Sequence, residues 1–259
     1  MLMSYMSEED IASLREFMDA GNGDAMYEYT VDNGAAFHTG DEYVALLKKS
    51  ADAGCYLAAE ELAYLFRDGE ATEGEFKFQK DEEKSRKYEE LAKTLEQRRR
   101  KSNESRILSY DFYGWVDIRW GENTFSASYV FPSFPLYILQ MCIDKLAKGG
   151  LMSEWFSDEE HRYDISEELV DGIPRLFIRW EDDERRKRVA EFPGYEFRSF
   201  ATRLVDDIEA DYFGFAYFMT TEGIGFADAI NDLKQTVVEL RAVLKRKGLE
   251  LTDGAELTK

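Results

Sequence analysis

The hydrophobic and polar positions have a helical period over the first 104 residues and an alternating period in much of the remaining chain. In the first part, apolar side chains recur three or four positions apart in four short stretches and in a longer one over residues 81–101. This is the spacing of one buried helix face. Gly21, Gly54 and Gly69 come directly after three of the short stretches, at positions where helices commonly end. The first part is therefore predicted to be a series of helices.

From residue 105 onward, the pattern predicts two β-hairpins, because alternation of apolar and polar residues is typical of half-buried strands. One hairpin covers residues 116–131 and the other residues 176–192, with shorter strands expected near residues 153–156 and 162–165. Helices are predicted after Ser133, after Gly194 and from Phe226 to Gly248. The aromatic run at residues 212–218 fits a strand or a helix, and periodicity leaves both open.

Together these elements predict an α+β protein of two domains. Residues 1–104 are expected to form an α-helical, solenoid-like region, and residues 105–259 an α+β domain. This second domain would combine an antiparallel sheet, covered on one face, with a long C-terminal helix. The basic run from Arg98 to Lys101 is expected to end the last helix of the first domain, with Ser102 and Asn103 as the linker.

One segment of the helical region occurs twice. Asp19-Ala20-Gly21 is followed by Ala25, and Asp52-Ala53-Gly54 is followed by Ala58, so the copies lie 54 − 21 = 33 residues apart. A period of this length is typical of repeats that consist of two helices. Such units stack on their neighbours and form curved surfaces that bind other proteins.

The second copy and the helix after it resemble a Sel-one-like repeat, a relative of the tetratricopeptide repeat. The residues that carry the resemblance are Gly54, Ala58, Leu62, Ala63, Phe66, Gly69, Lys84, Tyr88 and Ala92. It covers about residues 8–97, and the first copy is degenerate, since Tyr29 stands where a leucine is usual. The resemblance implies a helical fold that binds proteins, and it assigns no activity. Because two units are fewer than a stable array usually needs, the C-terminal domain is expected to cover the end of the stack.

The chain is strongly acidic, with 53 Asp and Glu residues, 33 Lys and Arg residues and a net charge of −20. This charge disfavours nucleic acid and anionic membranes as ligands. The sequence also contains no run of about 18 apolar residues, the length needed to span a bilayer. We expect another, basic protein as the partner; the alternative is that the acidity serves solubility alone. The N-terminus lacks the pattern of a secretion signal, and Cys55 and Cys142 are expected to be buried free thiols. A cytoplasmic location is predicted.

No motif in the sequence assigns catalysis. A glycine-rich phosphate loop, a nucleophile elbow and a zinc-binding helix are all missing, and with only His38 and His161 the sites that need several imidazoles are excluded. Cys142 lies beside the inward face of its predicted helix, where thiols are normally inert. The prediction is a non-enzymatic protein with no catalytic residue, no metal and no cofactor. An enzyme with an unrecognised carboxylate site is the remaining alternative.

Acidic clusters beside aromatic residues mark a predicted partner-binding surface in the α+β domain. This combination is expected of a hot spot against a basic partner, although a core role for each tryptophan is the alternative. The residues assigned to the surface are Trp155, Asp158, Glu159, Glu160, Trp180, Glu181, Asp182, Asp183 and Glu184.

These features favour a bacterial immunity protein that inhibits a toxin in the cytoplasm. The C-terminal region is loosely similar in pattern to α+β immunity proteins of bacterial toxin systems, in the aromatic hairpin at residues 116–131 and the strand from Leu176 to Trp180. The alternative is a general scaffold or adaptor that holds a peptide in the groove of its helical repeats. Either the repeat groove or the α+β domain would make the main contact, and the sequence leaves this choice open.

Overall fold

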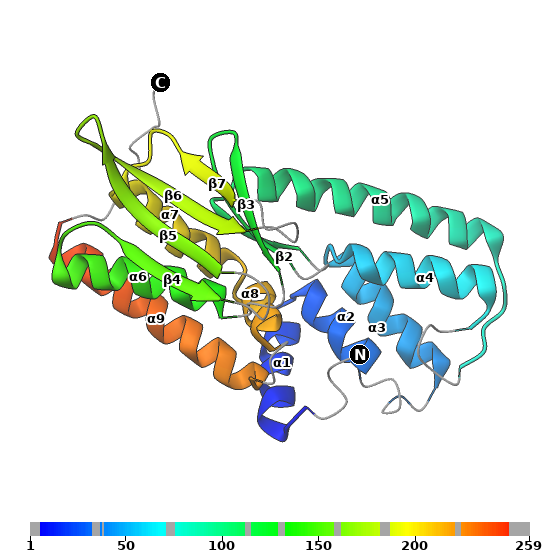
Figure 1. Cartoon of the computed structure of the whole chain (residues 1–259). Helices are drawn as coiled ribbons and strands as arrows, with labels where there is room; N and C mark the ends of the chain where they lie inside the picture. The colour runs from blue at the N-terminus through cyan, green and yellow to red at the C-terminus, as the bar shows by residue number, and fades with distance from the viewer. Residues whose placement is uncertain are drawn as a thin grey trace. The chain divides into compact units, whose positions relative to one another are not determined.

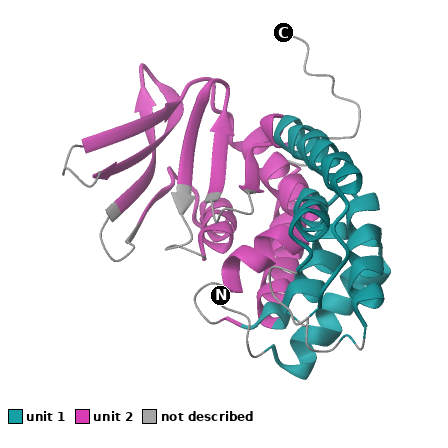
Figure 2. Cartoon of the chain, turned by 90° about the vertical axis from the view of Figure 1, so that its right-hand side faces the viewer, with its two compact units in different colours: residues 1–102, 225–227 teal, residues 103–224, 228–259 magenta. Residues whose placement is uncertain are grey.

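The chain is described by a computed structural model, which covers residues 6–32, 37, 39–70, 76–111, 115–128, 133–157, 162–181, 187–220 and 224–248. Helices come first, antiparallel sheets come next, and a long helix ends the described chain (Figure 1). The predicted α+β class is confirmed at this level. Two compact units are present (Figure 2): residues 1–102 with 225–227, here the helical unit, and residues 103–224 with 228–259, here the sheet unit.

The helical unit contains α1 (Glu8–Asp19), α2 (Gly23–Asp32), α3 (Gly40–Asp52), α4 (Tyr56–Asp68) and most of α5 (Glu82–Glu104). Two of these helices begin with a capping box, in which the N-cap hydroxyl and an acidic side chain three residues later each accept a hydrogen bond from the backbone N–H of the other residue. Ser7 and Asp10 form this capping box at α1, and Thr39 and Glu42 form it at α3. Each box satisfies two N–H groups that the first helical turn leaves without partners. Gly69, in the left-handed conformation at φ 79°, ends α4.

The buried face of α2 recurs in α4 at an offset of 33 residues. Each buried residue of α2 has a buried counterpart 33 positions later. The pairs are Gly23 and Tyr56, Ala25 and Ala58, Met26 and Ala59, Glu28 and Glu61, and Thr30 and Ala63. Since even an acidic residue is buried at the same position in both helices, the two helices pack in corresponding ways.

Side-chain hydroxyls join the helices of this unit through backbone carbonyls. The Ser50 hydroxyl of α3 donates to the carbonyl oxygen of Gly23 in α2 at 2.7 Å, and the Ser85 hydroxyl of α5 donates to that of Ala63 in α4 at 2.9 Å. Both bonds are buried. At Gly23, a Cβ atom would lie only 2.7 Å from the carbonyl oxygen of Ser50, so the close approach of α2 to α3 requires glycine.

The sheet unit contains two antiparallel sheets. The first has the order β1 (Leu108–Asp111), β2 (Trp115–Trp120) and β3 (Asn123–Ser128). The second has the order β4 (Ser153–Ser157), β5 (Arg162–Val170), β6 (Ile173–Glu181) and β7 (Lys187–Phe192). The helices of the unit are α6 (Phe134–Lys148), α7 (Phe197–Ala210), α8 (Tyr212–Met219) and most of α9 (Phe226–Arg246).

Buried aromatic and charged contacts hold the sheet unit together. The ring of Phe125 in β3 lies 5.3 Å from that of Trp180 in β6, in an edge-to-face arrangement. The half-buried carboxylate of Asp207 in α7 accepts hydrogen bonds from the backbone N–H groups of Ile107 at 2.7 Å and Leu108 at 3.0 Å. This carboxylate therefore fixes the start of β1 against α7.

Two features differ from the sequence predictions, and a third decides between two alternatives that the sequence left open. Within the described ranges, the strands form two sheets where one was expected. The run at residues 212–218 is helical, as α8. The predicted linker at Ser102 and Asn103 is wrong, because α5 continues to Glu104. The side chain of Asn103 donates to the carbonyl oxygen of Tyr110 at 3.2 Å, and both of these residues belong to the sheet unit.

Candidate functional site

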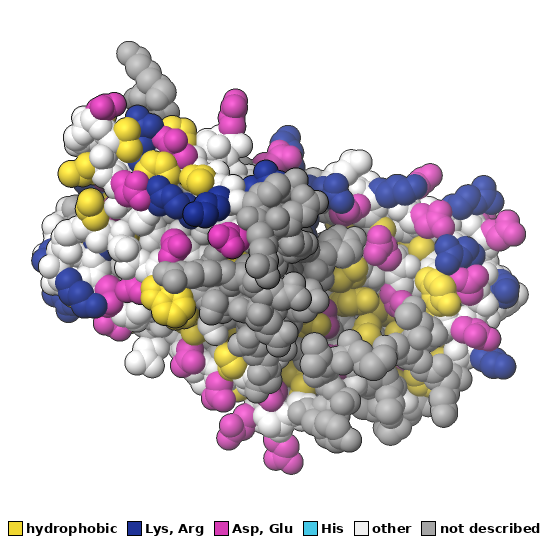
Figure 3. All heavy atoms as spheres, in the orientation of Figure 1, with side chains coloured by type: hydrophobic (Ala, Val, Ile, Leu, Met, Phe, Trp, Pro, Cys, Tyr) yellow, Lys and Arg dark blue, Asp and Glu magenta, His cyan; other side chains and the backbone are white. Residues whose placement is uncertain are grey.

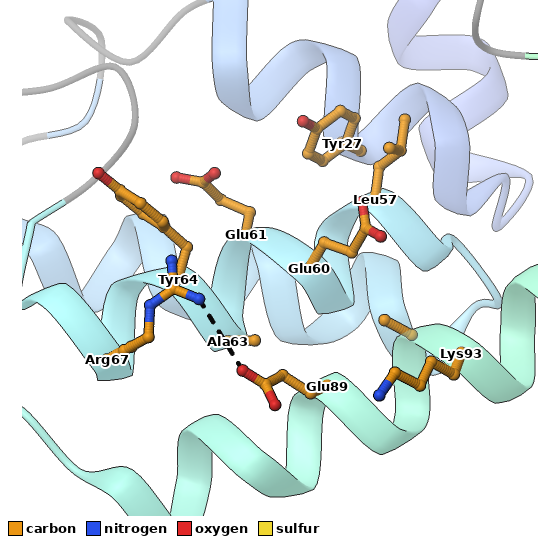
Figure 4. Close-up of a pocket in the computed structure, with 10 residues that line it drawn as sticks. Tyr27, Leu57, Glu60, Glu61, Ala63, Tyr64, Arg67, Glu89 and Lys93 are labelled. Atoms are coloured by element: carbon orange, nitrogen blue, oxygen red, sulfur yellow. Dashed lines mark ion pairs between the residues drawn. The ribbon is translucent and has the colours of Figure 1, made fainter.

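A groove of about 350 Å³ lies in the helical unit, among α2, α4 and α5 (Figure 4). One face of α4 forms much of its wall, because side chains three or four positions apart share a helix face. The residues that line the groove are Tyr27 of α2, Leu57, Glu60, Glu61, Ala63, Tyr64 and Arg67 of α4, and Glu89, Ala92 and Lys93 of α5.

One end of the groove contains the positively charged side chain of Arg67. The Arg67 guanidinium lies 3.0 Å from the Asp68 carboxylate and 3.9 Å from that of Glu89, the pair drawn as a dashed line in Figure 4. The same guanidinium sits 5.4 Å from the centroid of the Tyr64 ring, within the range of a cation–π contact. At this end, acidic side chains and an aromatic ring together surround a positive charge.

The other end of the groove is acidic and contains Tyr27, Glu60 and Glu61. Glu61 is buried, and the Tyr43 hydroxyl donates to its carboxylate at 3.4 Å. Burial and the nearby Glu96 raise the pKa of Glu60. Burial, with smaller contributions from acidic neighbours that include Glu61, raises the pKa of the Tyr27 hydroxyl. Both shifts indicate a site that disfavours additional negative charge.

Two groups at the acidic end are available to a ligand. Among the described residues, neither the Tyr27 hydroxyl nor the Glu60 carboxylate makes a hydrogen bond or an ion pair. Lys93 lines the same groove from α5, is exposed, and likewise forms no ion pair within the described part of the chain. The groove therefore offers an acceptor, a hydroxyl and an apolar wall at Leu57, which together suit recognition of a polar side chain.

The described residues offer few groups for other chemistry. No group of three or more His, Cys, Asp or Glu side chains in these ranges is placed to hold a metal ion. Cys55 and Cys142 are both buried free thiols, and burial raises the pKa of each well above its usual value. No helix in the described part of the chain is long and apolar enough to cross a membrane.

The two tryptophans of the predicted partner-binding surface lie on opposite faces of one sheet. Trp155 of β4 is opposite Asp164, which is opposite Arg179, so these three side chains share a face. Trp180 is opposite Tyr163, on the other face, and its ring packs against Phe125. Trp155 is 57% exposed, whereas Trp180 is half-buried, with its ring against the buried Phe125.

The acidic members of that predicted surface are only partly described. Glu181 is exposed at the end of β6, on the same face as Arg179. Asp158, Glu159, Glu160, Asp182, Asp183 and Glu184 lie outside the described residues. On the face of the molecule in Figure 3, acidic and basic side chains of the described residues are interspersed. The described residues therefore bring together Trp155 and Glu181 on one sheet face, without Trp180.

Sequence reasoning did not identify the groove residues. It expected a groove from the repeats, but it had no pattern that separates ligand-facing positions from other exposed ones. The usable signal was the stripe Leu57, Glu60, Glu61, Tyr64 and Arg67, which combines acidic and aromatic residues on one face of a helix.

Comparison with protein families, with curated proteins and with solved structures found no match.

Proposed function

We propose that the chain is a non-enzymatic protein-binding protein whose helical unit holds a segment of a partner protein. The observation that carries the proposal is the groove of about 350 Å³ among α2, α4 and α5. Its walls combine aromatic, aliphatic and charged side chains with a hydroxyl and a carboxylate that have no partner among the described residues. Grooves between helices are a common way to bind peptides.

The architecture proposed for the helical unit is a pair of Sel-one-like, tetratricopeptide-related repeats in a solenoid-like arrangement. The offset of 33 residues between the buried faces of α2 and α4 supports it, since it equals the offset of the duplicated sequence segment. Contact of α3 with both helices also fits units that stack through their neighbours. Repeats of this kind form binding surfaces rather than catalytic pockets.

For the partner, we propose a basic bacterial toxin that the chain inhibits in the cytoplasm, as an immunity protein. The net charge of −20 supports a basic partner, whose association would be accelerated by electrostatic attraction. The exposed Trp155, on a sheet face with Asp164, offers this partner a second contact. A general adaptor that binds several peptides in the same groove is the alternative.

The first experiment is a pull-down from an extract of the source cell, with the full-length chain as bait. Tyr64→Ala removes an aromatic wall of the groove, and Tyr137→Ala is the matched control, because both tyrosines are about equally exposed, at 36% and 40%. We expect a partner that Tyr64→Ala loses and Tyr137→Ala keeps. If Trp155→Ala loses the partner and Tyr64→Ala keeps it, the contact lies in the sheet unit and the groove is refuted as the binding site.

The identity of the captured protein separates the two kinds of partner. If a single basic protein is captured, it is expressed in a test cell with and without this chain, and growth is followed. We expect growth arrest by the captured protein alone and rescue by the intact chain. A captured protein that does not impair growth, or a mixture of several proteins, would favour the adaptor.

A further inference from the structure

We propose that the groove recognises a lysine or arginine side chain of the partner, which binds at the acidic end between Tyr27 and Glu60. This inference rests on the proposed function and names the chemistry that the groove selects. It is based on the charges of the groove, on the Arg67 side chain at its other end and on the groups that have no partner among the described residues.

The surroundings of Arg67 indicate the kind of ligand that the groove could bind. Arg67 places its guanidinium against the Tyr64 ring and within 3.9 Å of the Glu89 carboxylate. The acidic end repeats the same ingredients, a tyrosine and glutamates, without such a cation bound to Glu60 among the described residues. A cation from the partner would complete this end in the way that Arg67 completes the other.

The acidic end favours a positive charge over a neutral or negative one. The carboxylates of Glu60 and Glu61 line it, and Glu96 acts on Glu60 from α5. Because burial and Glu96 raise the pKa of Glu60 and so make its ionisation less favourable, a bound cation would relieve this cost and gain binding energy. The Tyr27 hydroxyl, on α2, supplies a further acceptor, and Leu57 can contact the aliphatic stem of a long basic side chain.

Lys93 is expected to oppose the binding of a basic side chain in the groove. It lines the groove from α5 and carries the same charge as the proposed ligand. Since its ammonium forms no ion pair with described residues, its main electrostatic effect on an incoming cation is repulsion. Removal of this charge is therefore expected to strengthen the binding of a basic segment, whereas removal of the Glu60 charge is expected to weaken it.

The test measures the binding of a fluorescein-labelled hexa-arginine peptide to the full chain by fluorescence anisotropy, at about physiological salt. A hexa-citrulline peptide serves as the uncharged counterpart of the same shape. We expect hexa-arginine to bind more tightly, Glu60→Gln to weaken its affinity about 2- to 5-fold, and Lys93→Gln to strengthen it by a similar factor. Circular dichroism of each variant establishes that it remains folded.

Charge-matched controls separate the groove from the general acidity of the chain. Glu90→Gln and Lys87→Gln make the same charge changes on α5 at exposed residues that do not line the groove. The inference is overturned if Glu60→Gln and Glu90→Gln have equal effects, or if hexa-citrulline binds as well as hexa-arginine. If a captured partner still depends on Tyr64 in that case, the groove function stands and only its preference for a cation fails. If hexa-arginine depends on Glu60 but no partner depends on Tyr64, the cation site stands and the proposed function fails.

Discussion

Replacement of Lys145 should destabilise the sheet unit more than any change at an exposed ion pair. The carboxylate of Glu167 in β5 has no exposed surface, and it accepts hydrogen bonds from the Lys145 ammonium of α6 and, at 2.9 Å, from the backbone N–H of Met152. Lys145 is itself largely buried, with its ammonium 4.7 Å from the centroid of the Phe197 ring. Lys145→Met keeps the aliphatic stem and removes the charge that neutralises Glu167.

The expected loss of stability has its cause in the burial of Glu167. Loss of one partner from a buried ion pair leaves an uncompensated charge and costs about 3–5 kcal/mol. The other oxygen of Glu167 has no hydrogen-bond partner among the described residues, so the bond from the backbone N–H of Met152 is the one that Lys145→Met leaves in place. With a urea dependence of about 2 kcal/mol per molar, the unfolding midpoint should fall by about 1.5–2.5 M.

Tryptophan fluorescence is a suitable assay, because all four tryptophans lie in the residues of the sheet unit. Lys148→Met is the matched control on the same helix, since Lys148 pairs with Asp144 at 2.6 Å but is 73% exposed. This control should cost no more than about 0.5 kcal/mol. In the double variant Lys145→Met with Glu167→Gln, no charge is stranded, and stability should partly return. A loss below about 1 kcal/mol for Lys145→Met, or a loss equal to that of the control, would refute the reasoning.

Three further predictions concern Gly23, Asp207 and the two cysteines. Gly23→Ala should destabilise the helical unit by about 1–3 kcal/mol in thermal unfolding followed by circular dichroism, because the new Cβ meets the carbonyl of Ser50 at 2.7 Å. Burial raises the pKa of Asp207, so the folded state holds this proton to a higher pH than the unfolded chain, and the stability that the group contributes falls as pH rises from about 4 through the raised pKa. Asp207→Asn should flatten this decline in urea titrations between about pH 4 and 7. Cys55 and Cys142 should react with a thiol reagent only after denaturation, since burial raises the pKa of both thiols.

Local patterns were enough to predict most elements, and the exceptions have local physical causes. The alternation of apolar and polar residues located the two strands on either side of Gly121, because one face of each strand is buried. Residues 212–218 gave no period because α8 is buried on nearly all sides. The decisive group was Asp211, whose side chain accepts a hydrogen bond from the N–H of Gly214 at 3.1 Å and begins the helix. This acid is one of many in the chain, so its capping role was not visible in the pattern.

The sequence pattern could not predict contacts between elements that are far apart along the chain, either in the sheets or in the groove. The division into two sheets depends on which strands pair, and β3 and β4 are separated by the whole of α6. The predicted surface failed to unite Trp155 and Trp180 because strand register sets the face of each side chain, and a register cannot be read from a single strand. The groove needs three helices, so no single stretch of sequence contains it.

The offset of 33 residues separates what is shared by the two proposed repeats from what differs between them. Buried positions correspond, down to the acidic pair Glu28 and Glu61, because each must fit the same packing environment. The groove positions do not correspond: Tyr27 occupies the position equivalent to Glu60, since 27 + 33 = 60. A face that packing does not constrain is free to acquire ligand chemistry. We therefore expect specificity for the partner to depend on Tyr27 and Glu60, where the repeats differ, rather than on the buried residues that they share.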